Sequence, residues 1–465
     1  MSSAVAGPAR ERVTRLPRAL PGGRVDTSPQ VPRRRVRSPL IWLAVACIWP
    51  LVVVTFSVPG RALPGSEERV DAVATVKVVV RVASLLVLAA GLLTHWRHRR
   101  RPVATRAFLP LVVFLGLAFA SALWSALPTF SLGQAGSLAV LVLLGGALAV
   151  AAEDEAATSQ ILGHLSGSLL VLNGAVLAVH LVDPQLSGLD RHGFQEFLGS
   201  RGLVHPTNAG ATAAVGMLLL ISARLLWGWG WTRALLVPGM AVHASVLFLA
   251  TARGALFITV ILMLATTLAL VGPLLRAVLV LLACVGIAGV VAMDPGFDHL
   301  KPVAQLTTHY IERGEPAERL SSLNGRTFLW RQIWASFTES PIIGHGYFVT
   351  SRTGRIDVPE WFRPPANRTA HNVILQVLVT TGVVGLALFL WGLAWPLGLV
   401  LAVRSDDRHR KRVVTLATFA LLYYVGAGMI GDSFMGPLQP ESVTFFVLLG
   451  LLVGTLPGSP SAVRV

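Results

Sequence analysis

A histidine and an asparagine, His371 and Asn372, stand where a polar stretch of the chain meets an apolar one. Nine residues follow, and then come Gly382, two apolar residues and Gly385. Histidine has an unperturbed pKa near ~6.5, so a neutral imidazole can accept a proton at neutral pH. His371 is therefore a candidate general base. The simpler interpretation is an interfacial histidine with a structural hydrogen bond. Four other histidines are expected outside the membrane and compete for the role: His192, His205, His309 and His345.

Four arginines could bind a negatively charged group. Arg201 precedes an apolar stretch, Arg253 lies at the tip of an apolar hairpin, and Arg326 begins an amphipathic stretch. Arg81 lies inside an apolar stretch, four residues after Lys77, so the two share one helix face. Guanidinium groups form paired hydrogen bonds with phosphate oxygens, so several at one surface would suit a diphosphate. The simpler roles are snorkelling toward lipid headgroups for Arg81 and ordinary helix-end charges for the others.

Apolar runs must position these residues. Apolar residues make up 54% of the chain and charged residues 13%. The runs are about 17–25 residues long, as a hydrocarbon core of roughly 30 Å requires. We expect an all-α polytopic membrane protein with about 12 transmembrane helices. The expected spans are about Leu40–Val58, Val78–Trp96, Phe108–Leu127, Leu132–Ala151, Ile161–Val182, Ala209–Leu226, Ala234–Ala250, Ala255–Val271, Ala277–Met293, Val373–Trp395, Val413–Ile430 and Val443–Leu456.

Charge sorts the polar segments to two sides of the membrane. Arginine and lysine concentrate in the N-terminal tail and in two short loops, which fall on one side, so that side and both termini are expected to be cytoplasmic. The segments that hold Arg201, Arg253, Arg326 and His371 then share the extracytoplasmic side. The expected organisation is a disordered cytoplasmic tail at 1–38, helices one to nine at 39–293, an extracytoplasmic loop at 294–370, helices ten to twelve at 371–457, and a cytoplasmic tail at 458–465.

The long loop is expected to contain one amphipathic helix. Leu329, Trp330, Ile333, Trp334 and Phe337 repeat at intervals of three and four, which places them on one face of about three helical turns. Tryptophan-rich amphipathic helices lie at the headgroup level. The helix would therefore hold Arg326 near the membrane surface.

Other classes of function fit the composition poorly. The net charge of +16 indicates nucleic-acid binding in some proteins, but in a membrane protein it marks the cytoplasmic side, so we expect no nucleic-acid partner. The two cysteines, Cys47 and Cys284, lie in apolar helices, which argues against a disulfide framework or a thiolate metal site. The sequence has no Gly-rich nucleotide loop and no His/Cys cluster with metal-ligand spacing. We expect neither a metal nor a cofactor.

Four motifs follow one another between Arg201 and Gly385. They are Arg201-Gly202 with His205-Pro206 and Asn208, then Thr251-Ala252-Arg253-Gly254, then Gly325-Arg326 with Trp330 and Pro341–Gly346, and finally His371-Asn372 with Gly382 and Gly385. In this order they resemble the O-antigen ligase and O-antigen polymerase family of bacterial membrane glycosyltransferases. The first motif departs slightly, because Thr207 separates Pro206 from Asn208. The first five spans match only in being hydrophobic.

The resemblance implies a fold similar to GT-C-type membrane glycosyltransferases and a reaction at the outer face of the cytoplasmic membrane. The donor would be a glycan on polyprenyl diphosphate, such as undecaprenyl diphosphate, and the acceptor a hydroxyl of a glycan or lipid. His371 would deprotonate the acceptor, while Arg253 and Arg326 would stabilise the departing diphosphate, with inversion and without a metal. We expect substrate contacts from Arg201, Asn372, Asn208 and Arg81. Ligation and repeat-unit polymerisation use the same parts and both stay open.

Two alternatives belong to other classes. A transporter or flippase of lipid-linked glycans has repeated halves and broken helices near the membrane centre, and the sequence gives no sign of either. A glycosyltransferase that uses a monophosphate-linked sugar would need an acidic base, for which Glu67, Glu68 and Asp71 are candidates.

Overall fold

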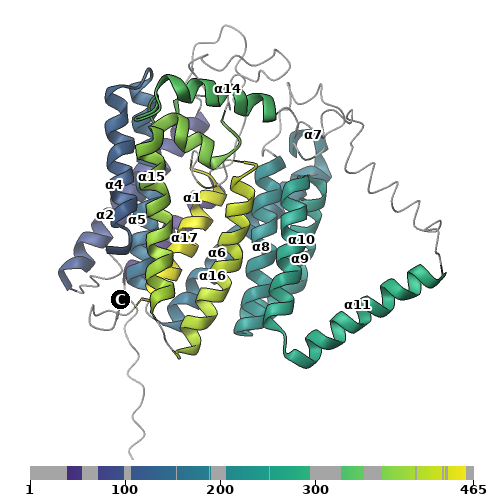
Figure 1. The fold of residues 1–465 in the computed structure, drawn as a ribbon. Helices are drawn as coiled ribbons and strands as arrows, with labels where there is room; N and C mark the ends of the chain where they lie inside the picture. The colour runs from purple at the N-terminus through teal and green to yellow at the C-terminus, as the bar shows by residue number, and fades with distance from the viewer. Residues whose placement is uncertain are drawn as a thin grey trace, which may run out of the picture. The chain divides into compact units, whose positions relative to one another are not determined.

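The computed structural model describes residues 39–54, 72–98, 106–152, 154–187, 189, 206–250, 252–293, 326–349, 369–403, 406–431, 434 and 438–456. Several predictions fall outside these residues. They concern the two tails, Arg201, the acidic residues before the second span, and the histidines at 192, 205 and 309. The described residues form helices and no strand (Figure 1).

The helices follow one another along the chain with short connections where both ends are described. They are α1 (Pro39–Val53), α2 (Ala72–His98), α4 (Leu109–Ala120) with the 3-10 turn η1 (Ser121–Leu123), α5 (Pro128–Ala151), α6 (Glu155–Val182), α7 (Pro184–Ser187), α8 (Pro206–Leu226), α9 (Gly230–Leu249), α10 (Arg253–Leu270), α11 (Pro273–Met293), α14 (Arg326–Glu339), α15 (Val373–Ala402), α16 (Arg408–Gly428) and α17 (Pro440–Gly454).

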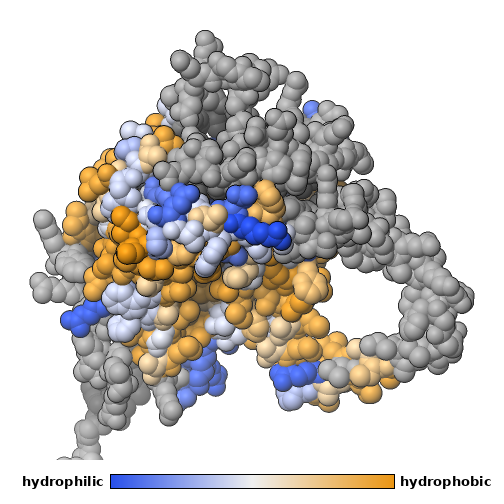
Figure 2. Space-filling model, turned by 45° about the horizontal axis from the view of Figure 1, so that its top comes forward, coloured by the Kyte–Doolittle hydropathy of each residue, from blue (hydrophilic) through white to orange (hydrophobic). Residues whose placement is uncertain are grey.

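Seven of these helices, α2, α5, α6, α8, α9, α10 and α15, are long and apolar enough to cross a membrane. Shorter apolar helices are α1, α4 with η1, α17 and the first part of α11. The prediction of an all-α protein with several spanning helices is therefore confirmed for the described residues, whereas the number of twelve spans stays a prediction. Figure 2 shows hydrophobic side chains over much of the described flank, with strongly hydrophilic ones in patches above and below this band.

The core of the bundle lies where α5, α8 and α17 are enclosed by their neighbours. α17 packs against α5 and α16, and α8 packs against α6, α9, α10 and α16. The side chains of α5, α8 and α17 are mostly buried, whereas large apolar side chains of α2 and α10 are exposed. This pattern is that of a membrane protein, in which helices at the rim present apolar faces to lipid.

One end of the bundle carries an aromatic and charged cluster. Trp227 and Trp229, in the turn between α8 and α9, stack at a centroid distance of 4.5 Å. Trp229 donates a hydrogen bond to Glu155 at 3.3 Å, and Arg412 lies 4.0 Å from the same carboxylate. His409 lies beside them; burial lowers its pKa, and the carboxylates of Glu155 and neighbouring residues oppose this shift. Tryptophan and charged side chains of this kind are typical of a membrane interface.

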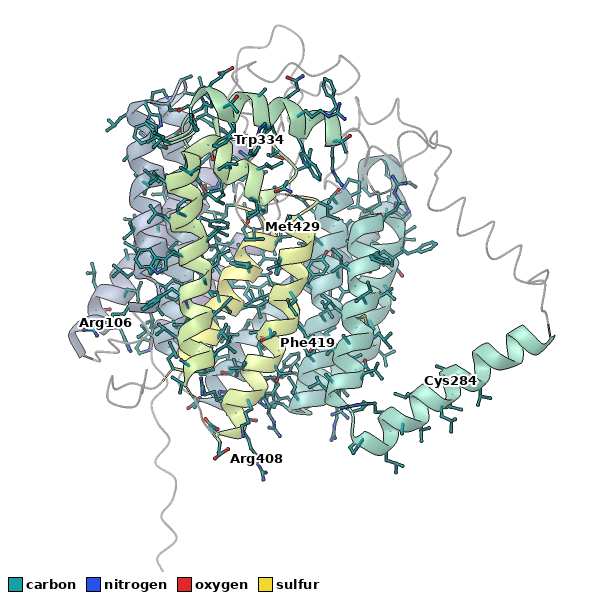
Figure 3. The ribbon with its side chains drawn as sticks, in the orientation of Figure 1. Arg106, Cys284, Trp334, Arg408, Phe419 and Met429 are labelled. Atoms are coloured by element: carbon teal, nitrogen blue, oxygen red, sulfur yellow. The ribbon has the colours of Figure 1, made fainter. Side chains whose placement is uncertain are left out.

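The opposite end of the bundle holds the beginning of α10, the end of α16 and residues 369–372, which directly precede α15 and are called the joint below. Figure 3 labels Arg408 and Met429 at the two ends of α16, with Trp334 of α14 beyond Met429. A helix is present where the amphipathic helix was predicted, as α14, which buries Leu329, Ile333 and Phe337, whereas Trp334 of the predicted apolar face is exposed. It packs against α15 and lies across this end of the bundle (Figure 1). Glu339 is its last residue, as the following Ser-Pro pair predicts.

The tenth predicted span differs from the structure. α15 extends from Val373 to Ala402, so it ends before the charged segment that begins at Arg404, as expected, but it is interrupted at Gly382, whose φ of 67° and ψ of −169° are not helical. The absence of broken helices inferred from the sequence is therefore wrong for this span. After the break, residues 383–402 are still long enough to cross a core of roughly 30 Å.

The segment 341–346 fills the break in α15. The backbone N–H groups of His345 and Gly346 donate to the carbonyls of Val379 and Thr380, at 3.2 and 2.9 Å. In return, the N–H group of Val383 donates to the carbonyl of Pro341 at 2.9 Å. Backbone groups that a continuous helix would have paired internally are thus paired with another part of the chain. The Pro–Gly segment and the glycine of the histidine motif therefore form one structural unit.

Candidate active site

His371 lies at the joint between the polar segment and α15. It has a φ of 47°, which is unusual for a residue with a side chain. Ala370, Asn372 and Val373 around it are 0%, 6% and 2% exposed, whereas His371 itself is partly exposed. His371 is thus the partly accessible residue in a stretch whose described neighbours are buried. This is the exposure that a group reacting with a substrate requires.

α14 is attached to this joint by a tryptophan. The indole Nε1 of Trp330 donates a hydrogen bond to the carbonyl of Ala370 at 2.9 Å, next to His371. Leu329 and Ile333 pack with Ala370 and Leu378 in one apolar cluster. Arg326, the first residue of α14, precedes Trp330 by four residues, or about one helical turn. The contacts therefore bring the segment that holds Arg326 to the segment that holds His371.

Asn372 attaches the joint to the end of α16. Its Oδ1 accepts a hydrogen bond from the N–H group of Leu375 at 3.0 Å and so caps α15. Its Nδ2 donates to the carbonyl of Met429 at 3.0 Å. These two bonds fix the amide in a structural position. The predicted substrate contact of Asn372 stays a prediction.

Arg253 begins α10 and reaches the same end of α16. A Cβ added at the next residue, Gly254, would overlap the side chain of Ile430, which follows Met429. α8 begins nearby, since a Cβ added at Gly210 would lie 2.7 Å from the Cβ of Ala252. Asn208, which is partly exposed, precedes Gly210 by two residues. The beginnings of α8 and α10 therefore lie near the end of α16, to which Asn372 is also bonded.

The structure does not bring Arg81 into this group. Arg81 is partly buried within α2, and α2 packs against α1 and α5. Among the described residues, those around His371 contact α14, α16 and, through α16, α10. A substrate contact of Arg81 would therefore need a ligand that extends along the flank of the bundle.

Two buried polar residues at this end were missed by the sequence reasoning. Gln376 is 1% exposed in the second turn of α15, and its Oε1 accepts a hydrogen bond from the N–H group of Ala370 at 2.7 Å. Glu441 is 1% exposed in the first turn of α17, within electrostatic range of Tyr423 and Tyr424. For Gln376 the available signal was a single polar residue in an apolar run, which in a membrane protein marks a residue worth testing.

No metal site accompanies these residues in the part of the chain that the structure describes. There, no three His, Cys, Asp or Glu side chains lie together in a way that could hold a metal ion.

Residues 238–390 match the family model described as O-antigen ligase. The predicted resemblance to this family is confirmed over this region. The match contains Arg253, Arg326, His371, Gly382 and Gly385 and leaves out the earlier motif with Arg201 and Asn208.

A curated relative adds a second similarity. The chain is 30% identical over 109 residues to the exopolysaccharide production protein ExoQ of Rhizobium meliloti (strain 1021). The alignment covers 22% of this chain and 25% of the relative, so this chain spans about a quarter of the length of the relative it matches. Together with the seven apolar helices, the O-antigen ligase similarity supports a multi-pass membrane protein with a role in glycan processing.

Proposed function

We propose that the chain transfers a glycan from a polyprenyl diphosphate lipid to an acceptor hydroxyl at the outer face of the cytoplasmic membrane. One observation carries the proposal: the joint at His371 is bonded to the helix that begins with Arg326 and to the end of α16, which contacts the residue after Arg253. These residues come from segments far apart in the chain. His371, Arg326 and Arg253 lie within the region that matches the O-antigen ligase family, and the end of α16 lies beyond it.

The electrostatics at these residues favour an anionic substrate. Arg253 is the first residue of α10 and Arg326 is the first residue of α14. The N-terminal end of a helix carries a partial positive charge and free N–H groups, so each guanidinium adds to a field that already attracts anions. A diphosphate has oxygens enough to bind both. The exposed apolar side chains on α2 and α10 would face the lipid tail.

The chemistry follows from these roles. His371 removes the proton of the acceptor hydroxyl as its oxygen forms a bond to the anomeric carbon of the donor sugar. The bond from that carbon to the diphosphate oxygen breaks, and Arg253 and Arg326 stabilise the charge on the leaving group. Attack opposite the diphosphate inverts the configuration of the anomeric carbon. The two guanidinium groups fill the role that a divalent ion has in other transferases.

The interrupted helix α15 meets one expectation for a transporter. The segment that occupies the interruption argues against that class. Transporters use broken helices to present free backbone groups to a substrate. Here the segment 341–346 already binds the backbone groups at the break. The structure therefore favours a transferase over a lipid-glycan flippase.

The direct test uses purified protein with a polyprenyl-diphosphate-linked glycan and a hydroxyl acceptor. We expect a new glycosidic bond of inverted configuration, detected by mass spectrometry and NMR, at a rate that EDTA leaves unchanged. A ladder of repeat units on the donor lipid would identify a polymerase, and a single transfer to another acceptor a ligase. Loss of activity with EDTA, or translocation of intact donor without a new bond, would refute the proposal.

The two arginines are expected to contribute about equally to leaving-group stabilisation. Arg253→Gln and Arg326→Gln should each lower kcat/KM by about 100-fold, as the loss of a fixed donor to a developing charge does. Arg331→Gln is the matched control, because Arg331 is exposed on the same helix as Arg326. Steady-state kinetics would measure all three. Equal small effects of the three substitutions would mean that neither arginine contacts the diphosphate.

A further inference from the structure

We infer that Gln376 is a positioning residue for His371 and sets the direction of its imidazole through the backbone of Ala370. The inference rests on the proposed role of His371 as the base. Gln376 follows His371 by five residues and lies inside α15, where its side chain is 1% exposed. A buried side-chain amide is expected to have a hydrogen-bond partner, because burying it without one costs about 1–3 kcal/mol.

Gln376 makes such a hydrogen bond. The N–H group of Ala370 donates to its Oε1 at 2.7 Å. Ala370 is fully buried and lies outside the helix, so no helical carbonyl is available to accept from this N–H group. Gln376 therefore satisfies a buried donor in the residue just before His371.

The other side of the same residue is held as well. The carbonyl of Ala370 accepts from the indole of Trp330 at 2.9 Å. After His371, the side chain of Asn372 binds both Leu375 and Met429 at 3.0 Å. The residues on both sides of His371 are thus fixed by side chains from α14 and α15 and by the end of α16.

The backbone conformation of His371 explains why the hydrogen bonds of Ala370 and Asn372 are needed. A φ of 47° in a residue with a side chain costs roughly 1–2 kcal/mol, so without support the backbone would relax toward a common conformation. A backbone rotation of about 20° would displace the imidazole by about 1 Å, and displacements of that size can lower a rate by about 100-fold. The described bond of Gln376 joins two points of the same segment, whereas those of Trp330 and of the Asn372 Nδ2 join this segment to α14 and α16.

The test compares Gln376→Leu with Gln376→Glu and with Asn173→Leu. Leucine removes the acceptor oxygen, whereas glutamate keeps one in either protonation state. Asn173 is the matched control: it is a fully buried amide bonded to His243 and Thr212, in α6, and has no contact with the joint. We expect Gln376→Leu to lower kcat by about 10- to 100-fold with KM for the donor within about twofold, and Gln376→Glu to recover most of kcat.

Different results would contradict the positioning role of Gln376 and the proposed function. If Gln376→Leu loses no more kcat than Asn173→Leu at a similar melting temperature, the positioning role is wrong. If Gln376→Leu does not fold, Trp330→Phe takes its place, since it removes the bond on the other side of Ala370; an unchanged kcat would then overturn the inference. Activity that survives His371→Ala would instead refute the base assignment on which the inference rests.

Discussion

Replacing His371 with alanine is expected to lower the rate of glycan transfer by about 100- to 10,000-fold, the usual contribution of a general base. His371 is partly exposed, whereas the described residues next to it are buried. None of these neighbours carries a side chain that could replace the imidazole as a base. The rate should be measured with purified protein and saturating donor. Binding of the donor should change little, because the diphosphate is assigned to Arg253 and Arg326.

The control for this substitution is His180→Ala. His180 lies in the last turn of α6, where it is partly buried and bonded to Ser187 at 3.0 Å. Its loss should leave the rate within about twofold, since an isolated partly buried hydrogen bond contributes only about 1 kcal/mol to stability. If both substitutions left the rate unchanged, the base would have to be sought among the other external histidines.

The sequence predicted the parts of the fold that depend on local pattern. The spacing of Leu329, Trp330, Ile333, Trp334 and Phe337 predicted the helix α14, although Trp334, which was predicted on the apolar face, is exposed. Each predicted span overlaps a helix, because an apolar run of sufficient length has few other ways to satisfy its backbone. The family resemblance could also be read from the sequence, because each motif is a short local pattern and their order needs no tertiary contact.

The break in α15 could not be predicted in the same way. Residues 373–402 read as one continuous apolar run, and glycine is tolerated in spanning helices. The interruption at Gly382 depends on backbone bonds with residues 341–346, which lie in a different part of the chain. The glycine spacing was visible, but its structural meaning needed the tertiary contact.

The site shows the same division. Asn372 was assigned to the substrate, yet an asparagine just before an apolar helix is also the usual N-terminal cap, and the structure has it in that position. Gln376 was not considered, because its partner Ala370 is reached only if the chain turns at His371 with a positive φ. Local sequence rules do not predict that conformation for a histidine.

Replacing Gly382 with alanine is expected to prevent the correct folding of α15. The combination of φ 67° and ψ −169° belongs to a region that only glycine populates, and another residue there costs about 1–3 kcal/mol. In addition, a Cβ at this position would overlap the backbone carbonyl of Ile342, which cannot move without losing the bonds that fill the break. We expect a melting temperature at least about 5 °C lower in detergent, a reduced yield of monodisperse protein, and loss of transfer activity.

Gly398 provides the matched control on the same helix. It is exposed, lies in the regular part of α15, and a Cβ added there would meet nothing within 4 Å. Gly398→Ala should leave the melting temperature unchanged or raise it slightly, since alanine is favoured over glycine in a helix by up to about 1 kcal/mol.

If Gly382→Ala behaved like Gly398→Ala, α15 would have to be continuous, and segment 341–346 would need other partners. The position of the joint would then not depend on the break, because Ala370 and Asn372 hold α15 at its beginning through Trp330 and Met429. A folded but inactive Gly382→Ala protein would instead show that the filled break helps to orient the segment that carries His371.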